Sequence, residues 1–186
     1  MNVYDFDNTI YAGDSTLDFY FYCLKKEPKI LICIPKQLFS ALKYKYKKIS
    51  KTQFKQEFYC FFKLLDNIDD KVNEFWNLNQ KKIKDWYKIE KKNDDVIITA
   101  SPEFLIQEIC KRMGISILIA SKVNPSNGQY TGFNCYGEEK VKRFYEVFPD
   151  RKIDKFYSDS KSDLPIATLA EKAYLVKKNH IEEWKK

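Results

Sequence analysis

The chain has 186 residues, of which 44% are hydrophobic and 32% charged. This composition excludes an intrinsically disordered or collagen-like chain and predicts one globular unit with a sizeable core. The net charge of +7 favours an anionic partner. However, the chain has only three arginines, Arg112, Arg143 and Arg151. Proteins prefer the guanidinium group of arginine for bidentate hydrogen bonds to bases and phosphates. The lysine excess therefore argues against a nucleic-acid partner and also fits the codon bias of an AT-rich genome.

The excess positive charge is confined to one segment. Residues 15–89 contain 16 lysines and 8 acidic residues, a balance of +8, whereas the remainder of the chain has a balance of −1. The same segment contains 16 of the 30 aromatic residues. It therefore differs in kind from the sequence on either side.

The predicted elements change character along the chain. Residues 3–6 form a short apolar run, which predicts a strand, and residues 15–88 then show apolar side chains at spacings of three and four, which predict helices only. From residue 94 onward, short apolar runs alternate with helical patterns. The predicted strands are 96–98, 115–119, 155–158 and 173–176; the predicted helices are 101–113, 140–148 and 164–172, with a hairpin arm near Asn127-Gly128 and Gly132, and a helix start beside His180.

Alternation of strands and helices predicts a parallel α/β sheet, with the helical residues 15–89 inserted after its first strand. The expected core is thus residues 1–14 and 90–186. The five cysteines are widely spaced and form no C-x-x-C pair, which predicts free thiols. The first residues show neither a signal peptide nor a membrane span, so we expect a cytoplasmic location.

Carboxylates gather where predicted strands end. Asp5-x-Asp7-x-Thr9 follows the first strand, and Asp159-x-x-x-Asp163 follows the apolar pair at 156–157. Because the carboxyl ends of parallel strands meet at one edge of a sheet, these side chains are expected to lie together. Carboxylates combined with substrate phosphate and water are the ligands that Mg²⁺ prefers.

Two further residues fit a phosphate site at the same edge. Thr99 ends the strand at 96–98 just before a predicted helix, where a hydroxyl and free amides stabilise phosphate. Lys140 supplies a cation for the remaining phosphoryl charge. The ordered succession of all four parts is a far more specific signal than any one of them.

These motifs resemble those of the haloacid dehalogenase-like (HAD) superfamily, in its phosphoserine-phosphatase-like branch. The matching residues are, in order, Asp5-Phe6-Asp7-Asn8-Thr9, the stretch from Ile97 to Pro102, Gly137-Glu138-Glu139-Lys140, and the stretch from Tyr157 to Asp163. The resemblance covers essentially the whole chain. It implies a Rossmann-like core with an inserted helical cap.

The resemblance also implies a role for each site residue. Asp5 would be the nucleophile that forms an aspartyl-phosphate, and Asp7 the general acid and then the general base. The metal ligands would be Asp5, the Asp7 carbonyl and Asp159, supported by Asp163, with Mg²⁺ as the cofactor. Thr99 and Lys140 would bind the phosphoryl group, Asp14 would contact substrate at the cap junction, and Thr9 and Ser101 would support the site.

Departures from the phosphoserine phosphatase pattern bear on the substrate. The second motif reads Thr99-Ala100-Ser101 where those enzymes carry Ser-Gly-Gly, and residues 15–89 contain no arginine to hold a substrate carboxylate. A lysine-rich, aromatic cap favours a more anionic or partly apolar phosphomonoester, small or lipid, as in the similar phosphatidylglycerophosphatase branch. Two alternatives stay open: a HAD-like binding protein whose basic cap contacts membrane or RNA, and phosphoryl transfer to an alcohol.

Overall fold

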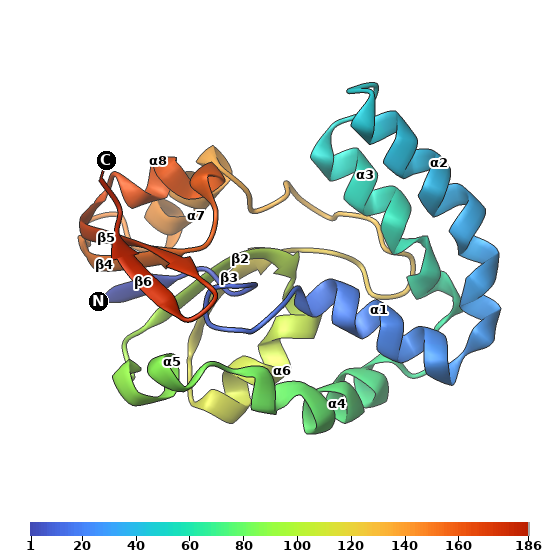
Figure 1. The fold of residues 1–186 in the computed structure, drawn as a ribbon, viewed down its shortest axis with the longest axis horizontal. Coiled ribbons are helices and arrows are strands. Elements are labelled where there is room, and N and C mark those ends of the chain that lie inside the picture. Colours follow the sequence, from blue (N-terminus) through green and yellow to red (C-terminus); the bar gives the residue numbers. More distant parts are fainter. Residues whose placement is uncertain (186) are drawn as a thin grey trace.

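The computed structural model describes residues 1–185, which form a six-stranded sheet with helices on both faces (Figure 1). The strands are β1 (Asn2–Tyr4), β2 (Val96–Pro102), β3 (Ile117–Ser121), β4 (Ile153–Ser158), β5 (Ala170–Lys177) and β6 (His180–Glu183). Their order is β3-β2-β1-β4-β5-β6, with the first five parallel and β6 antiparallel to β5. The prediction of a parallel α/β fold is confirmed.

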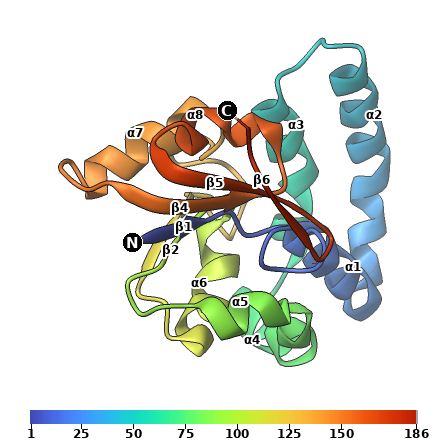
Figure 2. The same cartoon turned by 60° about the vertical axis from the view of Figure 1, so that its left-hand side comes forward.

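Each strand sends alternate side chains to opposite faces, and both faces are covered. Tyr4, Ile97 and Tyr157 belong to one buried cluster, and their neighbours Val3, Ile98 and Phe156 belong to the other. The first face is covered by α4 (Ile68–Asn79), α5 (Asp85–Glu90) and α6 (Glu103–Met113); the second is covered by α7 (Glu138–Val147) and α8 (Leu164–Ala167), as Figures 1 and 2 show.

The inserted segment begins with α1 (Ser15–Lys26) and projects from the sheet edge (Figure 1). It continues through a 3₁₀ turn (Pro28–Cys33), α2 (Ile34–Lys45), α3 (Lys51–Phe58) and a second 3₁₀ turn (Tyr59–Leu64). A short turn at Gln80–Lys82 then joins α4 to α5. In Figure 2, α2 forms the outer edge of the molecule and α3 lies between it and the rest of the chain. Pro28 and Pro35 both lie at the first positions of these helical turns, where a missing N–H costs nothing.

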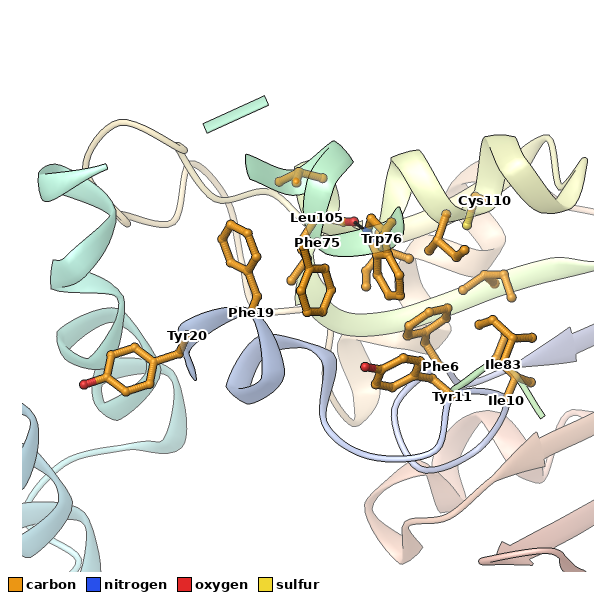
Figure 3. Packing of buried hydrophobic residues seen from close by; sticks show 14 of the residues in the cluster. Phe6, Ile10, Tyr11, Phe19, Tyr20, Phe75, Trp76, Ile83, Leu105 and Cys110 are labelled. Atoms are coloured by element: carbon orange, nitrogen blue, oxygen red, sulfur yellow. Dashed lines mark hydrogen bonds between the residues drawn. The ribbon is translucent and has the colours of Figure 1, made fainter. Parts of the chain in front are cut away.

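The two ends of the insertion are tied to each other at the sheet. Tyr11 and Ile83 form an antiparallel bridge, and the Lys84 N–H donates to the Ile10 carbonyl at 2.8 Å. Beyond this stem, α4 returns to the sheet through Trp76, which packs edge-on against Phe6 and Tyr11 (Figure 3). The Trp76 Nε1–H also donates to the Leu105 carbonyl of α6 at 2.7 Å.

Several element boundaries predicted from the sequence were wrong. β2 runs through Pro102, so Ser101 does not cap α6. The expected helix over 164–172 ends at Ala167, and β5 starts at Ala170. His180 lies in β6 and not at a helix start, because Lys178, with a φ of 56°, turns the chain back along β5. The expected hairpin arm is a turn at Asn124–Gly128 with one bridge between Val123 and Tyr130.

Candidate active site

Lys140 links two carboxylates at the carboxyl edge of the sheet. Its Nζ lies 2.8 Å from Asp5 Oδ1 and 2.7 Å from Asp163 Oδ2, and all three side chains are buried. Asp5 directly follows β1, Lys140 lies in the first turn of α7, and Asp163 immediately precedes α8. The Ser158 hydroxyl donates to the same Asp163 oxygen at 2.7 Å, which fixes the carboxylate that holds the lysine.

Asp7 is not part of the Lys140 contacts; its carboxylate is held by two serines, one of which begins the inserted segment. Its Oδ1 accepts the Ser15 N–H, at the start of α1, at 2.7 Å, and its Oδ2 accepts the Ser101 hydroxyl at 2.5 Å. Thr16 lies 3.2 Å from the Ser101 hydroxyl, which extends this chain of contacts into α1. Burial and the nearby Asp14 raise the pKa of Asp7 to about 6, although the two serines act in the opposite direction.

Asp159 approaches from β4 and is positioned by the loop that carries Asp7. The Thr9 hydroxyl accepts the Asp159 N–H at 2.9 Å, so Thr9 joins the two loops. Asn8, in the left-handed region with a φ of 56°, lies near Asp159 and acts to lower its pKa. Lys84 Nζ in turn donates to the Asn8 carbonyl and to the Lys178 carbonyl in the turn between β5 and β6.

Thr99 and Asp14 lie near the site, and their side chains form hydrogen bonds with the backbone. Thr99 is buried in β2, and its hydroxyl accepts the Ser101 N–H at 3.1 Å beside a bulge in the pairing with β3. Asp14 caps α1 by accepting the Leu17 N–H at 3.0 Å. The structure thus places Asp5, Lys140 and Asp163 in direct contact, and Asp7 against Ser101. It shows no direct contact of Thr99 or Asp14 with these carboxylates among the described residues.

The site contains more carboxyl groups than the single ammonium of Lys140 can neutralise. Burial, together with the neighbouring Asp163 and Asp7 charges, raises the pKa of Asp5 to about 7 despite the opposing effect of Lys140. Burial and Asp163 also raise the pKa of Asp159. Of the four aspartates Asp5, Asp7, Asp159 and Asp163, only Asp5 and Asp163 form an ion pair within the described residues, both with Lys140. A divalent cation would therefore relieve the excess negative charge.

The donor set fits Mg²⁺ in chemistry. No group of three or more His, Cys, Asp or Glu within residues 1–185 is arranged to hold a metal ion by itself. Mg²⁺ does not require such a cage, because it keeps several waters and binds through one or two carboxylates plus substrate phosphate. Asp5 and Asp159 are the carboxylates that would hold it.

The sequence did not reveal the role of Lys55, a residue of α3. Its Nζ donates to the Ala100 carbonyl at 3.0 Å, between Thr99 and Ser101, although the side chain starts from the inserted segment. Burial lowers the pKa of Lys55, while the charges of Asp7 and Asp14 act to raise it. One lysine among sixteen in residues 15–89 carries no sequence signal that would distinguish it.

Lys55 also lines a cavity of about 270 Å³ between α1, α2 and α3. Its walls are mainly apolar and aromatic, with charged groups at Asp14, Lys51 and Lys55. The remaining lining residues are Thr16, Leu17, Tyr44, Phe54, Phe58 and Tyr59. Because Thr16 contacts Ser101, and Ser101 contacts Asp7, the cavity adjoins the carboxylate cluster.

Comparison with known proteins identifies the family. Residues 3–168 match the model of the haloacid dehalogenase-like hydrolases, and the chain belongs to this family. The predicted membership of the haloacid dehalogenase-like superfamily is thereby confirmed.

A curated histidinol-phosphatase from Neisseria meningitidis is 33% identical over 90 residues, which cover 41% of this chain and 40% of that protein. The matched region spans less than half of the length of the curated relatives. A protein of unknown function from Bordetella pertussis has the same fold, with a TM-score of 0.76, 15% identity, and coverage of 93% of this chain and 87% of the other. A phosphoserine phosphohydrolase-like protein from Francisella tularensis gives a TM-score of 0.60, 17% identity, and coverage of 93% and 86%.

Proposed function

We propose that the chain is a Mg²⁺-dependent phosphatase that hydrolyses a phosphomonoester through a phosphorylated Asp5. The observation that carries this proposal is the ammonium of Lys140 between Asp5 and Asp163, beside a separately held Asp7. A carboxylate attacks a phosphate dianion only where the repulsion between them is neutralised. Lys140 is placed to supply part of that neutralisation.

In the first step, an Asp5 oxygen attacks phosphorus and the bond from phosphorus to the leaving oxygen breaks. Asp7 donates its proton to that oxygen, and a pKa raised to about 6 makes it protonated more often near neutral pH than an ordinary aspartate. In the second step, Asp7 takes a proton from the water that attacks the aspartyl-phosphate, which releases phosphate and restores Asp5. Mg²⁺, held by Asp5 and Asp159, would stabilise the charge that develops on the phosphoryl oxygens.

The cavity, which Thr16 and Ser101 connect to Asp7, supports a substrate with a partly apolar leaving group. Aromatic and aliphatic walls favour burial of an apolar leaving group, and the two lysines favour one that also carries negative charge. Small phosphomonoesters with such groups, and lipid phosphates, share this chemistry. Transfer to an alcohol in place of water would use the same residues.

The test is hydrolysis of an aryl phosphate with Mg²⁺ present. Asp5→Asn keeps the shape of the side chain but removes the nucleophile, so we expect turnover to fall at least about a thousandfold. EDTA should abolish wild-type turnover, and added Mg²⁺ should restore it. Asp150→Asn, on the exposed surface, is the matched control and should retain full activity. Wild-type turnover by a folded Asp5→Asn protein would refute the proposal.

A further inference from the structure

The outward side of α2 is apolar, which reverses the usual arrangement of a surface helix. The side chains that it buries include Gln37 and Ser40. Gln37 is held by hydrogen bonds with the Tyr20 hydroxyl and the Phe58 carbonyl. The opposite side of α2, its C-cap residue and the preceding 3₁₀ turn together carry six large hydrophobic residues that are between 52% and 76% exposed: Leu38, Phe39 and Leu42 in the helix, Tyr46 at the cap, and Leu31 and Ile32 in the turn. We call these six residues the outer face of α2.

The spacing of these residues makes the outer face continuous. Leu38, Phe39, Leu42 and Tyr46 follow one another at helical spacings of one, three and four, and Leu31 and Ile32 extend the row into the preceding turn. Single exposed hydrophobic residues are normal on a protein surface, but a contiguous row marks an interaction site. Figure 2 shows α2 at the outer edge of the molecule, with α3 on its inner side.

The segment of the chain that carries this face has charged residues of one sign only. Residues 28–56 contain eight lysines and no aspartate or glutamate. Lys29 is paired with Glu27 and Asp66, whereas no ion pair involves the other seven lysines within residues 1–185. Lys45, Lys47 and Lys48 are exposed beside the end of the outer face, and Lys43 lies over the Phe39 ring at 4.5 Å.

We propose that the outer face of α2 binds peripherally to the surface of an acidic lipid bilayer. An apolar strip flanked by lysines fits the boundary between acyl chains and anionic headgroups, where the strip is dehydrated and the lysines meet phosphates. A polyanion such as RNA would match the lysines but leave the leucines exposed. None of the helices in the described residues could span a bilayer.

The outer face is distinct from the carboxylate cluster and from the lining of the cavity, so the proposal can be tested apart from catalysis. Leu38→Glu/Leu42→Glu places charge within the apolar strip, and Lys45→Gln/Lys47→Gln/Lys48→Gln removes the nearby cations. The matched controls are Ile89→Glu, on the exposed part of α5, and Lys152→Gln/Lys155→Gln/Lys172→Gln, on the exposed surface near β4 and β5. Thermal unfolding shows, independently of any phosphatase activity, which of the variants are folded.

The measurement is sedimentation with vesicles of phosphatidylcholine, with and without phosphatidylserine. The wild type and both controls should sediment with the acidic vesicles only, and salt should release them. Both test variants should lose at least about tenfold in partitioning, with unchanged hydrolysis of a soluble aryl phosphate. Wild-type protein that stays with neither vesicle, or test variants that bind as well as wild type, would overturn the proposal. So would binding to RNA alone, or a wild-type dimer that Leu38→Glu/Leu42→Glu converts to a monomer.

Discussion

Two lysines near Asp5 and Asp7 lie in opposite electrostatic settings. Lys140 sits between Asp5 and Asp163, and these charges raise its pKa even though burial acts against them. Lys55 contacts a carbonyl and no carboxylate directly among the described residues, and burial lowers its pKa. A cation that is partly desolvated and has donor capacity to spare is well placed for an anionic ligand. Lys140 is thus suited to hold the site together, and Lys55 to meet the substrate.

Lys55→Gln should lower kcat/KM for an anionic phosphomonoester about tenfold, or about 1.4 kcal/mol, because it removes this charge beside Ala100. Steady-state kinetics should show the loss, and Lys55→Arg should restore part of it. Lys63→Gln alters an exposed lysine of the same segment and should leave kcat/KM unchanged. Equal kinetics for Lys55→Gln and wild type would remove Lys55 from the substrate site.

Asp95 is a buried carboxyl that should make stability depend on pH. One oxygen accepts the Lys92 N–H at 2.8 Å, and the other has no hydrogen-bond partner among the described residues. Burial raises the pKa of Asp95 to about 6, from about 4 in an unfolded chain. A folded-state pKa above the unfolded value means that stability is full below pH 4 and is lost as pH rises through 6.

In the wild type, the free energy of unfolding should fall between pH 4 and pH 7 as Asp95 ionises. In Asp95→Asn this fall should be smaller by about 1–2 kcal/mol. Urea unfolding of both proteins at each pH measures the difference. Asp150→Asn, at an exposed position, should keep the wild-type dependence. An unchanged pH profile in Asp95→Asn would show that another group dominates this range.

At the scale of elements, the inserted segment has two parts with different surroundings. The part containing α2 and α3 projects away from the sheet, whereas α4 and α5 cover one face of it (Figures 1 and 2). Trp76 of α4 joins Phe6, Tyr11 and Phe75 in one aromatic cluster (Figure 3). We propose that only the projecting part works as a cap over the site, and that α4 and α5 are structural.

Trp76→Phe should lower the free energy of unfolding by about 2–3 kcal/mol, because it leaves a void and removes the hydrogen bond to Leu105. Denaturant unfolding provides the measurement. Trp184 lies in the cluster on the other face, and its side chain makes no hydrogen bond within the described residues, so Trp184→Phe should cost less. A loss in Trp76→Phe no larger than in Trp184→Phe would indicate that α4 contributes little to the core.

The sequence predicted the fold best where a run of apolar residues marks a buried strand. The apolar runs around Val96 and Phe156 predicted central parallel strands, since both of their faces are covered. It was least successful where turn geometry decides, as at Lys178, whose left-handed backbone turns the chain into β6. The contact of Lys140 with Asp5 was predictable only in outline, as two groups at one sheet edge. Lys55 was not predictable, because its contact with Ala100 depends on where the projecting α3 is placed relative to the end of β2.

At the scale of the whole molecule, β1 is the first of the described strands to be synthesised, and it lies in the middle of the sheet. Its partner strands begin at Val96 and Ile153, so one edge of β1 lacks its native partner until about half of the 186 residues have been made, and the other edge until most of them have been made. Asp5 likewise meets Lys140 only when α7 has been synthesised. Pairings so distant in sequence slow folding, because a long loop must close before any contact stabilises it. The cluster of Asp5, Lys140 and Asp163 is therefore among the last features to form during synthesis. A nascent chain that ends within the inserted segment contains β1 as an unpaired apolar strand and lacks most of the active-site residues.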